Sequence, residues 1–248
     1  MQNLASIILF LGVLFDSSGQ SKNSPLQISH LTGDFYVYKT FHDYNGTLIS
    51  ANAMYLVTDK GVVLFDTPWD ETQYQPLLDN IKAKHNKDVI MCFATHSHED
   101  RAGGLEFYRQ KEIKTYTIKA TDEILKSENK KRAEFIIPND TTFTIGQHSF
   151  EVCYPGKGHA PDNIVVWFDK EKVLYGGCFI KSAEAKDLGY LGNADVKEWE
   201  KSIQKVQTKF KNPIYIIPGH DDWTNVESLK HTLKMVQKYN TAQVSGKK

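Results

Sequence analysis

The 248-residue sequence predicts an α+β fold, a four-layer αββα sandwich in which two β-sheets pack together and helices cover their outer faces. Segments rich in β-branched and aromatic residues come in two groups, and segments with helical periodicity follow each group. Because sheets and helices must bury their apolar faces against another layer, this order favours two packed sheets with helices outside them. No stretch rich in Pro, Gly or Ser divides the halves, which predicts one domain.

The first half of the chain supplies an antiparallel meander, a helix and a buried strand. Apolar residues at helical spacing between Tyr74 and Ile81 predict the helix. The apolar run "DVIMCFAT" that follows predicts a strand buried on both faces. Gly103 and Gly104 then allow a tight turn into a short helix that begins near Leu105. The strands of the meander are "DFYVYKT", "NAMYLVTD" and "GVVLFDT".

The second half repeats this plan. Asp195, with Glu198 three residues later, predicts the N-terminus of a helix with an apolar face that includes Trp199 and extends to Phe210. A final helix is expected to carry apolar residues from Val226 to Val236. The strands expected in this half are "TFTI", "HSFEVCY", "NIVVWF", "KVLYGG" and, between the two helices, "PIYIIPGH".

Residues 1–19 predict a signal peptide, which leaves residues 20–248 as the mature domain. An apolar stretch from Leu4 to Phe15 precedes Ser17 and Gly19, which are spaced like the −3 and −1 positions of a cleavage site. The stretch is too short to span a bilayer comfortably, so we expect no stable membrane insertion after its removal. We therefore expect a periplasmic protein. A buried N-terminal strand or helix stays open as an alternative, because no Lys or Arg precedes the apolar stretch.

Composition limits the possible partners. Thirty basic residues balance thirty acidic ones and neither sign forms a long run, which excludes the footprint of a nucleic-acid binder or a polybasic membrane binder. We expect a small-molecule substrate and a monomer. Three cysteines are too few and odd in number for a disulfide framework, so at least one thiol stays free, either buried or held by a metal.

The stretch "MCFATHSHEDRAGG" places His96, His98 and Asp100 within five positions, directly after a strand. Neutral imidazole and ionised carboxylate are zinc ligands, and a short loop can direct them towards one point or two neighbouring points. Taken alone, the stretch is also compatible with a polar loop that ends in a capping aspartate.

Three further donors follow strands elsewhere in the chain. His159 lies in "GKGHAPDN", Cys178 in "YGGCFIK" and His220 in "IIPGHDDW". Each alone is weak evidence, but loops that follow strands form the functional edge of such sheets. The other five histidines lack this context and are interpreted as ordinary residues: His30, His42, His85, His148 and His231.

Six donors are too many for one tetrahedral ion and suit two ions that keep open positions for water or substrate. Three imidazoles would form one Lewis-acidic site, and an Asp-Cys-His set would form a softer, more anionic site. Two such ions close together lower the pKa of a shared water towards neutrality. The pattern therefore favours a hydrolase.

The motifs "THSHEDRAGG", "GHAPDN", "GGCFIKS" and "PGHDDW" together resemble the class B β-lactamases, and in particular their first subclass. The resemblance extends from about Asp34 to the final helix. It implies the αββα fold and hydrolysis of the amide bond of penicillins, cephalosporins and carbapenems by a metal-bound hydroxide. It also implies two Zn²⁺ per chain, the first held by His96, His98 and His159 and the second by Asp100, Cys178 and His220.

The resemblance also implies roles around the metals. Asp100 would be the catalytic carboxylate that steers the hydroxide, and Lys181, Tyr190 and His159 would contact the substrate, with Lys181 pairing its carboxylate. Many family members have asparagine where this chain has Tyr190, so assistance to the lactam oxygen from this position is an open question. Arg101 is expected to brace the loop.

Two alternatives remain open at this point. The first is a hydrolase of thioesters or lactones on the same scaffold, like glyoxalase II. Such enzymes usually have histidine and a bridging aspartate where this chain has Arg101 and Cys178, which favours the lactamase branch. The second is a non-catalytic periplasmic zinc-binding protein, for which closed four-ligand sites would be expected. The segment Phe41–Ser50 lies where the family has a flap over the substrate, and it could equally be a packed hairpin.

Overall fold

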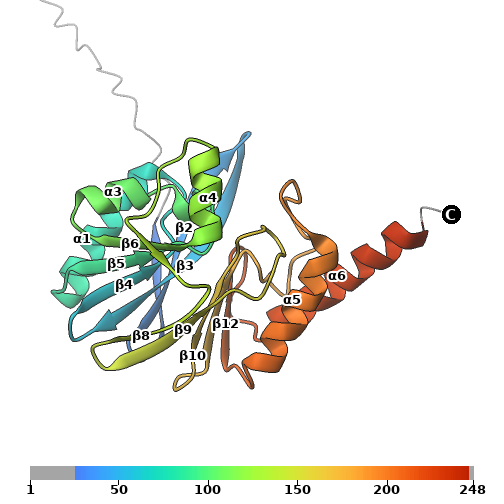
Figure 1. Cartoon of the computed structure of the whole chain (residues 1–248). Helices are drawn as coiled ribbons and strands as arrows, with labels where there is room; N and C mark the ends of the chain where they lie inside the picture. Colours follow the sequence, from blue (N-terminus) through green and yellow to red (C-terminus); the bar gives the residue numbers. More distant parts are fainter. Residues whose placement is uncertain (1–25, 246–248) are drawn as a thin grey trace, which may run out of the picture.

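The computed structural model describes residues 26–245, so the predicted signal peptide lies outside the described residues. It confirms the four-layer sandwich (Figure 1). The helices of the first half, labelled α1, α3 and α4, lie on one side of the two sheets, and the long helices α5 and α6 lie on the other side. Within residues 26–245, no helix is both long enough and apolar enough to cross a membrane.

The first sheet has seven strands in sequence order. Strands β1 to β4 are antiparallel, as the predicted meander required, and β4 to β7 are parallel. The sequence prediction missed β1, β6 and β7. The strands are β1 (Gln27–Thr32), β2 (Phe35–Tyr44), β3 (Thr47–Thr58), β4 (Gly61–Phe65), β5 (Val89–Phe93), β6 (Lys114–Ile118) and β7 (Phe135–Ile137).

The second sheet has five strands in the spatial order β12-β11-β10-β9-β8. Neighbouring strands are antiparallel except β11 and β12, which are parallel and end at the same edge. The loops that carry His159, Cys178 and His220 leave from this edge, whereas the loop with His96, His98 and Asp100 follows β5 of the first sheet. The strands are β8 (Asp140–Ile145), β9 (His148–Cys153), β10 (Val165–Phe168), β11 (Val173–Gly177) and β12 (Tyr215–Pro218).

The helices largely follow the predicted boundaries. The Asp195 carboxylate accepts a hydrogen bond of 3.1 Å from the Glu198 backbone N–H, so the predicted cap of α5 is confirmed. The prediction for Val226 was wrong, because the final helix begins at Ser228 and Val226 is 43% exposed. The helices are η1 (Glu71–Gln73), α1 (Tyr74–His85), α2 (Glu99–Ala102), α3 (Leu105–Gln110), α4 (Lys119–Ser127), α5 (Val196–Lys209) and α6 (Ser228–Ser245).

The main core lies between the two sheets. Phe65 of the first sheet meets Phe150 and Phe168 of the second in edge-to-face contacts with centroid distances of 5.2 and 5.5 Å. Strand β4 is buried along its whole length, because the second sheet covers one of its faces and helices cover the other. This rigid core fixes the sheet edges that carry the site.

One histidine interpreted as ordinary joins the two sheets. His148, the first residue of β9, is buried, and its Nε2 lies 2.8 Å from Asp34 Oδ2 in the turn after β1. Its Nδ1 lies 3.3 Å from Glu171 Oε1 in the turn after β10. These contacts of His148 lie at the end of the two sheets opposite the predicted metal ligands, and they have a structural role.

Candidate metal centre

Three imidazoles meet where β5 ends and the loop after β9 returns. His96 Nε2 lies 3.1 Å from His98 Nδ1. The ring of His159 lies 5.2 Å from that of His96 and 5.1 Å from that of His98, between centroids. One nitrogen from each ring lies within 4.8 Å of the other two. Three imidazole nitrogens at this spacing can share one ion.

A second group of donors adjoins the first. Cys178 Sγ lies 3.3 Å from Asp100 Oδ2 and 3.2 Å from His220 Nε2. His220 Nε2 lies 3.3 Å from the same Asp100 oxygen. One ligand atom each of His96, Asp100 and Cys178 also lie within 4.8 Å of one another. The structure therefore brings all six predicted donors together in two neighbouring sets.

Local backbone geometry explains how the second set closes. A short helix, α2, begins after His98 and returns Asp100 towards the centre, where the carboxylate is buried. Gly219 lies against Cys178, and a β-carbon at Gly219 would lie 2.7 Å from Cys178 Sγ and 2.6 Å from its backbone nitrogen. Only glycine lets the end of β12 approach the thiol this closely.

Arg101 lies beneath the second set and is fully buried. Its Nη2 lies 3.0 Å from Asp100 Oδ2 and donates to the Gly219 carbonyl at 2.7 Å. Its Nη1 donates to the Asn52 carbonyl at 2.6 Å. The guanidinium thus ties two ligand-bearing loops to β3, as the expected bracing role requires.

Sequence reasoning missed Asp66, which braces the first set. This buried carboxylate follows β4 and accepts hydrogen bonds from the Thr95 backbone N–H at 2.6 Å and the Thr95 hydroxyl at 2.9 Å. It also accepts one from the Tyr175 hydroxyl at 2.5 Å. Thr95 directly precedes His96, so Asp66 fixes the start of the ligand loop. A lone aspartate after a wholly apolar strand was the available signal.

The electrostatics differ between the two sets. Burial and the neighbouring charges lower the pKa values of His96 and His159 well below the usual range, so both rings are neutral. Burial would raise the pKa of Asp100, but Arg101 and His220 hold it well below its usual range. Burial would lower the pKa of His220, but Cys178 and Asp100 raise it to about 9. His96 and His159 therefore offer lone pairs, whereas Asp100 in the second set carries a negative charge.

The ligand rings are oriented by contacts on their far sides. His98 Nε2 lies 3.3 Å from Asn193 Oδ1, and His220 Nδ1 lies 2.6 Å from the Ser50 carbonyl. Acceptors at these nitrogens favour the tautomers that leave the inner nitrogens free for a metal. The buried His159 Nδ1 has no hydrogen-bond partner among residues 26–245. The donor chemistry of both sets fits metal ions.

The structure places two of the predicted substrate contacts beside the centre. Lys181, three residues after Cys178, retains only 8% exposure and is therefore no ordinary surface lysine. The ring of Tyr190 lies 5.7 Å from that of His98, between centroids, and 60% of the residue is exposed. The segment Phe41–Ser50 forms the far end of the β2–β3 hairpin, where Tyr44 and Leu48 are exposed.

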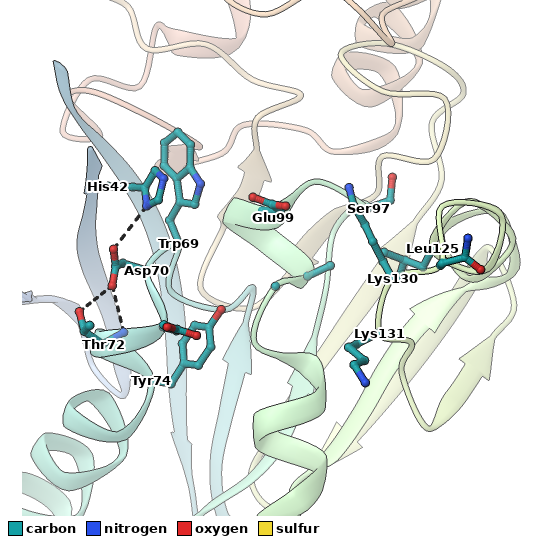
Figure 2. Close-up of a pocket in the computed structure, with 14 residues that line it drawn as sticks. His42, Trp69, Asp70, Thr72, Tyr74, Ser97, Glu99, Leu125, Lys130 and Lys131 are labelled. Carbon is teal, nitrogen blue, oxygen red and sulfur yellow. Dashed lines mark hydrogen bonds and ion pairs between the residues drawn. The ribbon is translucent and has the colours of Figure 1, made fainter. Parts of the chain in front are cut away.

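A cavity of about 550 Å³ opens beside the ligand loop. Figure 2 shows His42, Trp69 and Asp70 on one side, Lys130 and Lys131 on the other, and Glu99 of α2 between them. Trp69 links the cavity to the metal ligands, since its ring lies 6.0 Å from that of His220. The cavity is large enough for a small molecule, although none of the six predicted metal ligands is among the residues that line it.

Fold and site together define the class: an αββα protein that holds metal ions at the edge where its two sheets end. A model of the metallo-beta-lactamase superfamily matches residues 46–220. The chain belongs to the metallo-β-lactamase superfamily.

Individual relatives agree with this assignment. The chain is 46% identical over 238 residues to Metallo-beta-lactamase type 2 of Elizabethkingia meningoseptica, with 96% of each chain covered. It is 48% identical over 208 residues to Metallo-beta-lactamase IND-1 of Chryseobacterium indologenes, which covers 84% of this chain and 87% of that one. The crystal structure of metallo-beta-lactamase IND-7 superposes with a TM-score of 0.83 at 46% identity, over 88% of this chain and all of the other.

Proposed function

We propose that this protein is a zinc β-lactamase that hydrolyses the amide bond of penicillins, cephalosporins and carbapenems. The observation that carries the proposal is the convergence of six donors in two adjoining sets, one of three imidazoles and one of a carboxylate, a thiol and an imidazole. The relatives named metallo-beta-lactamase at 46% and 48% identity support the choice of substrate.

The donor types support zinc and a count of two ions. Imidazole nitrogen, thiol sulfur and one carboxylate oxygen suit zinc and disfavour Mg²⁺ or Ca²⁺, which require oxygen ligands. Each set supplies three protein ligands, which leaves a position for water or substrate on each ion. His96, His98 and His159 would hold the first ion and Asp100, Cys178 and His220 the second.

When bound, the two zinc ions would polarise the lactam carbonyl and lower the pKa of water. The chain's own residues orient the reaction. Asp100, kept ionised and fixed by Arg101, accepts a hydrogen bond from the attacking water and sets its direction. Lys181 binds the carboxylate of the substrate, and Tyr190, exposed beside His98, contacts the substrate. The His159 ring completes the wall against which the substrate lies.

We propose export to the periplasm with removal of residues 1–19, which leaves residues 20–248 as a single-domain monomer. The apolar stretch from Leu4 to Phe15, followed by Ser17 and Gly19, supports export, and the burial of the three free cysteines is compatible with an oxidising compartment. All six donors come from one chain, so the site needs no second copy.

The test uses the purified mature protein, residues 20–248. We expect hydrolysis of a carbapenem and a chromogenic cephalosporin, loss of both activities with a chelator, and recovery on zinc addition. Metal analysis should give two zinc ions per chain. A thioester of similar size serves as the control substrate. Hydrolysis of the thioester without hydrolysis of either lactam, or full zinc occupancy without any hydrolysis, would contradict the proposal.

A further inference from the structure

The Lys181 ammonium group is held in an unusual way. The residue is 8% exposed, and among residues 26–245 its Nζ makes no hydrogen bond or ion pair. Its backbone is tied to α6, because its N–H donates to the Thr232 hydroxyl at 2.8 Å and its carbonyl accepts from that hydroxyl at 3.2 Å. Gly189 covers the end of the side chain, since a β-carbon there would lie 3.6 Å from Nζ.

The contact that faces this ammonium is the ring of Trp199 on α5. Lys181 Nζ lies 5.6 Å from the centroid of the indole. The electron-rich face of an indole attracts a cation, and the attraction strengthens when water is excluded. Burial lowers the pKa of Lys181, and the nearby Cys178 and Asp100 oppose that shift.

Trp199 is itself fixed. It has no exposed surface, and its indole N–H donates to the Phe179 carbonyl at 3.0 Å. Gly158 lies against the ring, because a β-carbon there would be 2.9 Å from it. The indole also lies 5.9 Å from the His159 ring, between centroids. One rigid side chain therefore contacts both the lysine and a metal ligand.

We infer that Trp199 is a positioning residue that holds the Lys181 ammonium ready for the carboxylate of the substrate and sets its place relative to His159. The inference rests on the proposed function of Lys181. A flexible lysine loses side-chain freedom when it pairs with an anion, so a lysine held in place beforehand binds that anion more tightly. Trp199 acts through Lys181 and does not itself touch the reacting atoms.

Another tryptophan provides a matched control. Trp167 of β10 is also buried and belongs to the same apolar cluster beneath α5 and α6. Lys172 Nζ lies 5.5 Å from its ring centroid, much like the contact in the site. Lys172 pairs with Asp169, far from the metal ligands in the turn after β10. Trp167→Leu therefore removes a buried indole from the same cluster, but it leaves the contacts of Lys181 unchanged.

The experiment measures KM and kcat of the zinc-loaded mature enzyme for a cephalosporin and for its carboxylate methyl ester. We expect Trp199→Leu to raise KM for the acid about tenfold and leave KM for the ester unchanged. Trp199→Phe, which keeps an aromatic face, should restore most of the affinity. Trp167→Leu should change neither KM, and zinc content is measured for every variant.

Lys181→Met separates this inference from the proposed function. If Lys181→Met raises KM for the acid and not for the ester, while Trp199→Leu raises neither or both equally, Trp199 has no positioning role. If Lys181→Met does not distinguish acid from ester, the carboxylate-binding role of Lys181 is wrong.

A measurement on the wild type covers the case in which Trp199→Leu fails to fold. The ε-methylene protons of Lys181, assigned by their absence in Lys181→Met, should show an upfield ring-current shift like that of Lys172. Unshifted Lys181 resonances would overturn the inference.

Discussion

Replacement of Arg101 by methionine should lower the free energy of unfolding by about 3–5 kcal/mol, because it removes one partner from a buried ion pair. Arg101 has no exposed surface, and its guanidinium lies 3.0 Å from Asp100 Oδ2 and 3.4 Å from Asp66 Oδ2. Methionine keeps much of the side-chain length and packing but leaves the buried Asp66 without a counter-charge and leaves Asp100 with His220 alone.

Hydrogen bonds and proton uptake set where in this range the cost falls. The guanidinium donates to two buried carbonyls, those of Asn52 and Gly219, and bonds from a charged donor are worth about 1.5–3 kcal/mol each. The cost from Asp66 is limited, because this carboxyl can take up a proton when Arg101 is absent. Burial already raises its pKa to about 6 in the presence of Arg101, and protonation costs about 1.4 kcal/mol for each unit by which the pH exceeds the pKa. The destabilisation should therefore be larger at about pH 8 than at about pH 5.5.

Urea unfolding with excess chelator measures this effect without a contribution from bound metal. Arg109→Met is the matched control, because Arg109 pairs with Glu106 at 2.6 Å on the surface and should cost less than about 1 kcal/mol. Arg101→Met in an Asp66→Asn background should cost less than in the wild type, because the carboxylate left without a counter-charge is gone. Equal costs for the two arginine variants, or no difference between the backgrounds, would refute the reasoning.

Three further outcomes follow from the structure. Cys178→Ser removes the sulfur donor, so we expect zinc content to fall below two per chain and turnover to drop by at least about tenfold; wild-type values for both would contradict the second metal site. Gly219→Ala places a β-carbon 2.7 Å from Cys178 Sγ and should destabilise the zinc-loaded protein by about 1–3 kcal/mol, whereas an unchanged thermal midpoint would show that the loop can move away. Burial would raise the pKa of Asp34, but the hydrogen bond from His148 lowers it below the ordinary value of 3.8. The contribution of this ionised carboxylate to stability is therefore present above pH 3.8 and is lost as the pH falls through the lower pKa of the folded state. Asp34→Asn should therefore be less stable near neutral pH and match the wild type in acid, as urea midpoints across that range will show.

Several elements could be predicted from the sequence because their signals are local. The helix after Asp195 combines a capping aspartate with an apolar stripe, and both act within a few residues of chain. The predicted meander likewise follows from short turns between apolar strands. By contrast, Lys114–Ile118 was not predicted, although its threonines, tyrosine and isoleucine are typical of a strand. The segment is short, and only its pairing with β5 and β7, which are distant in sequence, shows that it is a central strand of the sheet.

In the site, too, local features could be predicted from the sequence and long-range contacts could not. Histidine, aspartate and cysteine after strand ends indicated the donors, since residue type and strand boundary are local properties. The residues that hold those donors in place could not be identified from the sequence. Asp66 and Arg101 lie 35 positions apart, and nothing in the sequence shows that they share one buried network. Trp199 was expected only on the apolar face of its helix, and its contact with the Lys181 ammonium depends on how α5 packs against the end of β11.

The sequence by itself determined the kind of chemistry, because donor atoms, helix caps and strand ends depend on residue type and on near neighbours in the chain. Only the tertiary structure decided which charges are buried together, which ligands share a set and which side chains hold them in place. The physical reason is that burial and pairing energies depend on distances between segments far apart in the chain, and the packing of the two sheets sets those distances.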